Sequence, residues 1–115
     1  MTRFDHIEAH VSDITRYCSF LEALFEGGQS EVVSPNGTSM FTAPDGTCIE
    51  VKLRRIDASP INSGFCRPCL RRPRPRELLR SLNLAVNEEI DAPFGKVLFF
   101  DDHEEITWHI KDLPE

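Results

Sequence analysis

The chain has 115 residues, of which 40% are hydrophobic and 28% are charged, and its formal net charge is −6. This length suits one ordinary hydrophobic core, so we expect a single domain. The acidic balance argues against non-specific nucleic-acid binding. The apolar runs are too short to span a membrane, and residues 1–5 lack the apolar stretch of a signal peptide. We therefore expect a cytoplasmic protein with reduced cysteines.

Residues 4–11 alternate between polar and apolar side chains, which predicts a half-buried strand. Ser12 or Asp13 then has the side chain of a helix N-cap. Apolar residues recur at helical spacing from there to Phe25, and Gly27 and Gly28 are expected to end the helix. The polar face of the strand carries three candidate functional residues: His6, Glu8 and His10.

Three short strands are expected to follow, over residues 29–33, 38–42 and 47–54, with turn-forming sequences between them. The last of them places Ile49 and Val51 on one face and Glu50 and Lys52 on the other. The first half of the chain, about residues 1–55, is therefore predicted to have the order β-α-β-β-β.

The same order is predicted again after a linker over residues 56–63. A strand over residues 64–70, a helix over 74–82 and strands over 84–90, 96–100 and 105–111 make up a second module, about residues 64–115. In its last strand Trp108 and Ile110 share the apolar face, whereas His109 and Lys111 lie on the polar face. The expected class is α+β, with two modules in one domain.

Three stretches of this sequence resemble the vicinal oxygen chelate superfamily: HIEAHVSD at residues 6–13, FLEALF at residues 20–25, and PDG followed by IEV at residues 44–51. That superfamily includes glyoxalase I, extradiol dioxygenases, and bleomycin- and fosfomycin-resistance proteins. The resemblance implies two β-α-β-β-β modules that form a curled mixed sheet around a cleft. It also implies a small-molecule ligand and a homodimer.

Metal ligands in that superfamily come from the first and last strands of each module. Carried over by position, this implies His6, Glu50 and His109 as ligands. The remaining position falls near Phe65 or Cys66. Phe65 cannot bind a metal, whereas Cys66 can, although cysteine is unusual there. Cys66 and His10 are also candidates for contact with a substrate.

Two imidazoles and one carboxylate suit a divalent metal such as Zn, Ni, Mn or Fe. Such an ion can act as a Lewis acid on two adjacent substrate oxygens, in a lyase-like reaction, or activate oxygen as Fe(II) in a dioxygenase-like one. A glyoxalase-like isomerisation also needs a base next to a carbonyl. Glu8 is one candidate for this base, and Glu50 is another if it leaves the metal.

Other interpretations of these residues remain open. Half-exposed strands carry polar side chains even where no metal binds. In that case the protein is a metal-free binding or sequestering protein, as in the resistance branch. A third interpretation is a regulatory module that uses the arginine-rich segment of the basic middle of the chain, which runs from Lys52 to Arg80. Cys66 and Cys69 form a C-x-x-C, but a zinc site needs a second pair and a redox site needs a helix start, so we interpret them as ordinary cysteines.

Overall fold

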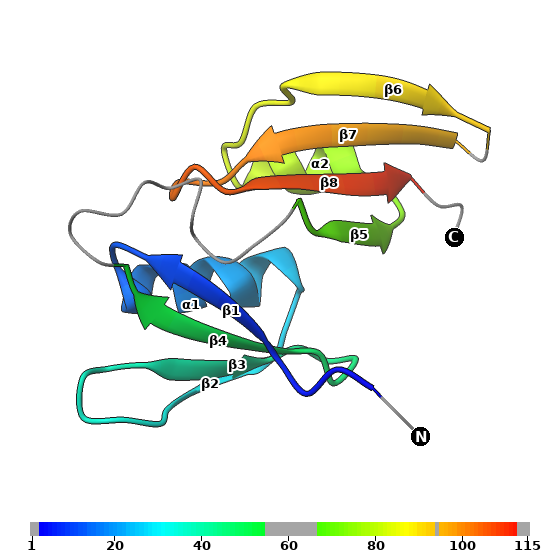
Figure 1. Cartoon of the computed structure of the whole chain (residues 1–115). Helices are drawn as coiled ribbons and strands as arrows, with labels where there is room; N and C mark the ends of the chain where they lie inside the picture. Colours follow the sequence, from blue (N-terminus) through cyan, green and yellow to red (C-terminus); the bar gives the residue numbers. More distant parts are fainter. Residues whose placement is uncertain (1–2, 55–66, 94, 113–115) are drawn as a thin grey trace. The chain divides into compact units, whose positions relative to one another are not determined.

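A computed structural model describes residues 3–54, 67–93 and 95–112 of the chain (Figure 1). The chain divides into two compact units, Met1–Phe65 and Cys66–Glu115. Each unit contains a strand, a helix and three further strands in that order, with a four-stranded mixed sheet that is not closed. The predicted α+β class and the repeated β-α-β-β-β order are confirmed. The expected linker over residues 56–63 lies outside the described residues, and the arrangement of both modules in one domain around a shared cleft stays a prediction.

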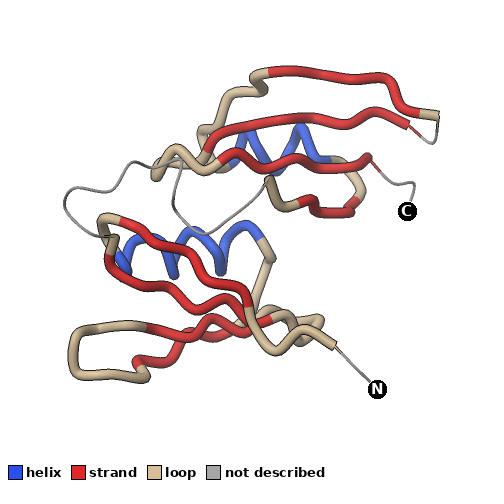
Figure 2. Tube along the Cα trace, in the orientation of Figure 1, coloured by secondary structure: helices blue, strands red, loops and turns tan. Residues whose placement is uncertain are grey.

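The first unit consists of β1 (Ile7–Val11), α1 (Ile14–Leu24), β2 (Gln29–Val32), β3 (Ser39–Thr42) and β4 (Cys48–Leu53). Its sheet has the order β1-β4-β3-β2, with β1 parallel to β4 and the other pairs antiparallel. The Asp13 carboxylate caps α1 by accepting a hydrogen bond from the Arg16 N–H at 3.0 Å. The chain thereby turns from β1 directly into the helix that covers the apolar face of the sheet (Figure 2).

The core of the first unit lies between α1 and the sheet. The alternation in β1 and β4 buries Ala9, Val11, Ile49 and Val51 against the helix, as predicted. Ile7 differs from the expectation because it stays 40% exposed. It is the first residue of a strand at the edge of the sheet, where fewer neighbours can cover it. Because α1 covers this apolar face, the polar side chains of β1 and β4 lie on the opposite face of the sheet. The further buried apolar residues are Tyr17, Cys18, Leu21, Leu24, Phe41 and Ala43.

The second unit consists of β5 (Cys69–Arg72), α2 (Pro75–Ser81), β6 (Glu88–Ala92), β7 (Gly95–Asp101) and β8 (Thr107–Asp112). Its sheet repeats the arrangement of the first, with the order β5-β8-β7-β6 and a parallel β5–β8 pair. Residues 64–66 of the strand predicted over 64–70 lie outside the described residues; within the described part β5 begins at Cys69, since Arg67 has a positive φ of 48° and Pro68 has no N–H for a ladder. β6 is also displaced toward the C-terminus, after the left-handed Asn83.

The core of the second unit is built around Trp108, which is 1% exposed, and Ile110. Both lie on the face of β8 that the alternation predicted to be apolar. The indole N–H of Trp108 donates a hydrogen bond of 2.9 Å to Oδ2 of the buried Asp102. The other carboxylate oxygen of Asp102 accepts from the backbone N–H groups of Glu104 and Ile106, at 2.8 and 3.1 Å. A buried polar group therefore holds the turn between β7 and β8.

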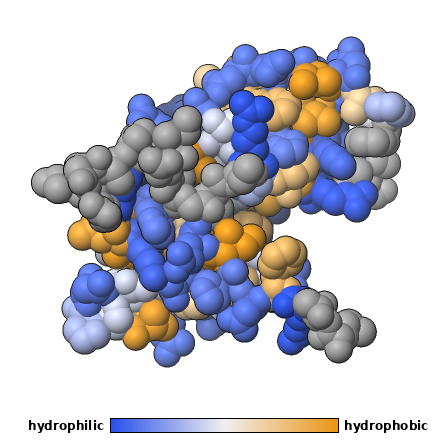
Figure 3. Space-filling view, in the orientation of Figure 1, coloured by the Kyte–Doolittle hydropathy of each residue, from blue (hydrophilic) through white to orange (hydrophobic). Residues whose placement is uncertain are grey.

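The visible surface intersperses apolar side chains among polar ones (Figure 3). Phe4, Val32 and Leu53 are the most exposed large hydrophobic side chains of the described residues, at 93%, 67% and 59%. No helix within the described ranges is both long enough and apolar enough to cross a membrane. The described cysteines Cys18, Cys48 and Cys69 are free thiols.

Candidate metal and ligand site

The candidate site lies on the polar face of the parallel β1–β4 pair. The register places Glu8 beside Glu50 and His10 beside Lys52. Side chains at paired positions project from the same face of a sheet, so these four residues gather on the side away from α1. His6 lies one residue before β1 and extends the same alternating set.

His6, Glu8 and Glu50 form a compact group of possible metal ligands. Each offers one donor atom, and these three atoms all lie within 4.8 Å of one another. Two ligands of a single ion with bonds of roughly 2.0–2.2 Å lie at most about 4.4 Å apart, so small side-chain rotations bring the group to one cation. One imidazole nitrogen and two carboxylate oxygens are donors that Mn, Fe and Zn accept. The residues therefore fit a divalent metal.

Lys52 lies between the two carboxylates of this group. Its Nζ is 2.9 Å from Oε1 of Glu8 and 3.2 Å from Oε1 of Glu50. The hydrogen bond from Lys52 is the main cause of a lowered pKa at Glu8, and the hydrogen bond to Glu8 is in turn the main cause of a raised pKa at Lys52. Both carboxylate–ammonium contacts are charge-assisted, and they hold a positive charge at the donor group.

The two histidines of the first unit each contact an acidic residue. Nδ1 of His6 is 2.8 Å from Oδ2 of the exposed Asp5, and this hydrogen bond is the largest cause of a raised pKa at His6. Nε2 of His10 is 3.4 Å from Oε2 of Glu8. His10 therefore contacts the donor group from the side, as the alternation of residues 6–10 predicted for this face.

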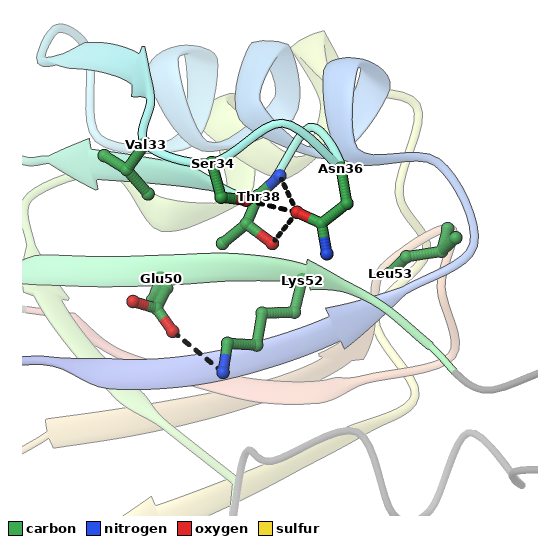
Figure 4. A pocket seen from close by; sticks show the side chains of 7 residues that line it. All are labelled: Val33, Ser34, Asn36, Thr38, Glu50, Lys52 and Leu53. Atoms are coloured by element: carbon green, nitrogen blue, oxygen red, sulfur yellow. Dashed lines mark hydrogen bonds and ion pairs between the residues drawn. The ribbon is translucent and has the colours of Figure 1, made fainter.

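A pocket of about 420 Å³ opens beside the donor group, between β4 and the loop that joins β2 to β3 (Figure 4). Oδ1 of Asn36 accepts hydrogen bonds from the Thr38 N–H at 3.2 Å, from the Thr38 hydroxyl at 2.9 Å and from the Ser34 hydroxyl. These donors fix which end of the amide is oxygen, so the Asn36 nitrogen is the end presented toward β4. The residues that line the pocket are Val33, Ser34, Asn36, Thr38, Glu50, Lys52 and Leu53.

His109 lies in the second unit, on β8, where it stacks on Phe99 with ring centroids 4.9 Å apart. Burial lowers the pKa of His109, and the positive charges of Lys111 and Arg67 lower it further. His109 pairs with Cys69, as Glu50 pairs with Glu8. Two residues before Cys69 stands Arg67, at the place that His6 holds in the first unit. The strand register thus assigns the fourth ligand position of the resemblance to Arg67, and an arginine cannot bind a metal.

The structure therefore brings together His6 and Glu50, as expected, and adds Glu8 to them. Whether His109 joins this group stays a prediction, and Cys66 lies outside the described residues. Lys52, Asp5 and Asn36 also belong to this surface, although the sequence pattern did not indicate them as site residues. A signal for Lys52 was present, because it follows Glu50 by two residues on the same face of β4. The signal for Asn36 was weaker, since Asn-Gly is also an ordinary turn sequence.

The fold matches those of many solved structures. A glyoxylase/bleomycin resistance protein/dioxygenase domain from Frankia sp. EAN1pec matches with a TM-score of 0.74 at 16% identity, over 99% of both chains. The fosfomycin resistance protein FosX from Listeria monocytogenes, complexed with Mn(II) and sulfate ion, matches with a TM-score of 0.74 at 14% identity, over 99% of this chain and 92% of that one. The chain has the vicinal oxygen chelate fold.

A third structure with this fold, the oxidase ChaP-H1, matches with a TM-score of 0.72 at 12% identity, over 99% of this chain and 98% of that one. No protein-family model matches the sequence, and no curated protein matches it significantly. The vicinal oxygen chelate fold that the sequence motifs predicted is confirmed, whereas proteins that share it differ in what they do.

Proposed function

We propose that this protein binds a divalent metal ion at His6, Glu8 and Glu50 and holds a small oxygen-bearing molecule beside it, for a lyase-like or dioxygenase-like reaction. The single observation that carries this proposal is the approach of three donor atoms to within 4.8 Å of one another. The fold supports it, because the FosX structure that this chain resembles was obtained with Mn(II).

The proposal extends to His109 as a further ligand, from the second unit of the same chain or of a partner in a cytoplasmic homodimer. Burial and positive neighbours lower the pKa of the His109 imidazole and so favour its neutral form, which is the form that binds metals. The same positive charges of Arg67 and Lys111 oppose a cation, so we assign the larger share of metal affinity to the first unit.

The side chains of the first unit have separable tasks. A bound divalent ion supplies Lewis acidity toward oxygen atoms of the ligand. Glu8 is held as a carboxylate below its ordinary pKa, which makes it a good cation ligand and a weak proton acceptor. Glu50 borders both the donor group and the pocket, so it is the carboxylate that would take a proton from a molecule in the pocket if it leaves the metal. His10 contacts Glu8 and thereby limits the directions in which that carboxylate can turn.

The test is a metal titration of protein first stripped with a chelator. Mn(II), Zn(II), Ni(II) or Fe(II) is added, and the bound metal and the melting temperature are measured. An ion present at 100 times its dissociation constant stabilises the folded state by about 2.7 kcal/mol, which raises the melting temperature by several degrees. Glu50→Gln and His6→Ala should lose most of this increase, whereas Glu22→Gln, at an exposed position of α1, should retain it. No increase for wild-type protein with any of the four metals contradicts the proposal.

One observation favours the alternative of a metal-free binding or sequestering protein. The Lys52 ammonium already contacts Glu8 and Glu50 at salt-bridge distance and offsets one of their two negative charges. In that case the pocket beside Lys52 binds its ligand without metal, and ligand affinity is the same in chelator-treated and metal-supplemented protein.

A further inference from the structure

We propose that the pocket beside β4 is a site for a small oxyanion that becomes available when metal binding frees Lys52 from Glu8 and Glu50. The ligand class is a molecule with a carboxylate, sulfate, phosphate or phosphonate group. This inference rests on the metal site proposed above. It names the ligand class of the pocket beside that site and the residue that couples ligand binding to metal binding.

The first support is the position of Lys52, which belongs to both sites. Its ammonium contacts the carboxylates of Glu8 and Glu50, and its side chain lines the pocket of about 420 Å³. The side chain is 42% exposed, so no packed core holds its ammonium on the carboxylates. The lysine side chain has a flexible four-carbon stem, so it can present its ammonium either to the two carboxylates or to the pocket.

The second support is the hydrogen-bond arrangement at Asn36. Three donors from Ser34 and Thr38 converge on Oδ1, which leaves the amide nitrogen as the group offered to the pocket. Figure 4 shows this nitrogen on the side of Asn36 that is turned toward β4. An amide nitrogen is a donor, and an oxyanion is the ligand that a donor and an ammonium recognise together.

The third support is the charge balance of the shared group. With two carboxylates around it, the Lys52 ammonium is compensated and attracts an anion only weakly. A divalent cation bound to the same carboxylates repels the ammonium and replaces it as their counter-charge. The positive charge of Lys52 is then available to the pocket, and Glu50, which also borders the pocket, no longer repels an anion there.

Coupling of this kind is reciprocal by thermodynamic necessity. If metal raises oxyanion affinity by a given factor, the oxyanion raises metal affinity by the same factor. A lysine that occupies the metal ligands in the absence of metal also lowers metal affinity, so its removal strengthens metal binding while it abolishes the coupling.

The experiment measures sulfate binding by calorimetry, with and without saturating Mn(II), at constant ionic strength. In wild-type protein Mn(II) should lower the dissociation constant of sulfate at least tenfold. In Lys52→Met we expect Mn(II) to bind about tenfold more tightly and sulfate to bind equally weakly with and without it. Lys52→Arg keeps the charge and should keep the coupling.

Two further variants separate a specific site from general charge effects. Asn36→Asp retains the Oδ1 acceptor for Ser34 and Thr38 but replaces the amide donor, so it should weaken sulfate binding and leave Mn(II) binding intact. Lys96→Met is the matched control, because Lys96, a residue of the second unit, also bridges two carboxylates, those of Glu89 and Asp91 at 3.2 and 2.8 Å. It should change neither measurement.

The results distinguish this inference from the proposed function. If wild-type protein binds Mn(II) but sulfate affinity is independent of it, the coupled site is wrong and the metal site stands. If Lys52→Met retains the coupling, sulfate binds the metal directly and the role of Lys52 is wrong. If wild-type protein binds no metal, the proposed function itself fails, and the coupled site fails with it.

Discussion

Replacement of the buried Asp102 should lower the free energy of unfolding of the second unit more than replacement of an exposed residue does. Its two carboxylate oxygens accept three hydrogen bonds, from the Glu104 and Ile106 N–H groups and from the indole of Trp108, and the residue is 5% exposed. Hydrogen bonds to a charged group contribute about 1.5–3 kcal/mol each, and a buried donor left unpaired costs about 1–3 kcal/mol. Allowing for shared geometry and entry of water, Asp102→Ala should lower the free energy of unfolding by about 3–5 kcal/mol.

Asp102→Asn refines this prediction, because it can retain an oxygen for the two backbone donors while it turns an NH₂ group toward the indole. The loss should then be about 1–3 kcal/mol, between wild type and Asp102→Ala. Trp108 is the single tryptophan of the chain, so its fluorescence in urea reports on the second unit. The control is Asp101→Ala, which removes one exposed hydrogen bond, from the Thr107 hydroxyl at 2.6 Å. Equal stability of Asp102→Ala and Asp101→Ala would refute the role assigned to Asp102.

Two further predictions concern the first unit. The raised pKa of His6 means that a proton competes with metal to a higher pH, so Mn(II) affinity should rise as pH increases through that pKa. Asp5→Asn should move the midpoint of this pH dependence to lower pH, and an unchanged midpoint would contradict the role of Asp5. The contact between Asp5 and protonated His6 also stabilises the fold below the ordinary His pKa of 6.5, and this stabilisation is lost as pH rises through the raised pKa. Gly28→Ala should cost about 3 kcal/mol in urea unfolding, because φ is +102° and the added Cβ would lie 2.7 Å from the Phe41 ring, whereas Gly46→Ala, with φ of +93° and open space, should cost about 1 kcal/mol. Equal losses at both glycines would contradict the crowding at Gly28.

The fold could be predicted from the sequence wherever periodicity and burial agree. The alternation assigned Ile49 and Val51 of β4 and Trp108 and Ile110 of β8 to the buried face correctly, whereas Leu53 at the end of β4 is 59% exposed. The start of β5 could not be predicted in the same way. Arg67 adopts a left-handed backbone and Pro68 cannot join the ladder, so the apolar residues there do not mark where pairing begins.

The candidate site could be predicted only in part, because the sequence of one strand does not fix how that strand pairs with its neighbour. Alternation along one strand puts His6 and Glu8 on one face, but it does not give the register with the neighbouring strand. That register, which pairs Glu8 with Glu50, decides that Glu8 belongs with the metal ligands. It also places Lys52 beside both carboxylates, a contact that depends on a parallel pairing between residues more than forty positions apart.

The central claim is that Glu8 joins His6 and Glu50 in holding a metal ion. The most direct test is the Mn(II) affinity of Glu8→Gln, measured by the disappearance of free Mn(II) in electron paramagnetic resonance. Glu22→Gln serves as the matched exposed control. We predict that Glu8→Gln binds Mn(II) at least tenfold more weakly than wild type, a loss of about 1.4 kcal/mol or more, whereas the control binds as wild type does. Wild-type affinity in Glu8→Gln would contradict the claim.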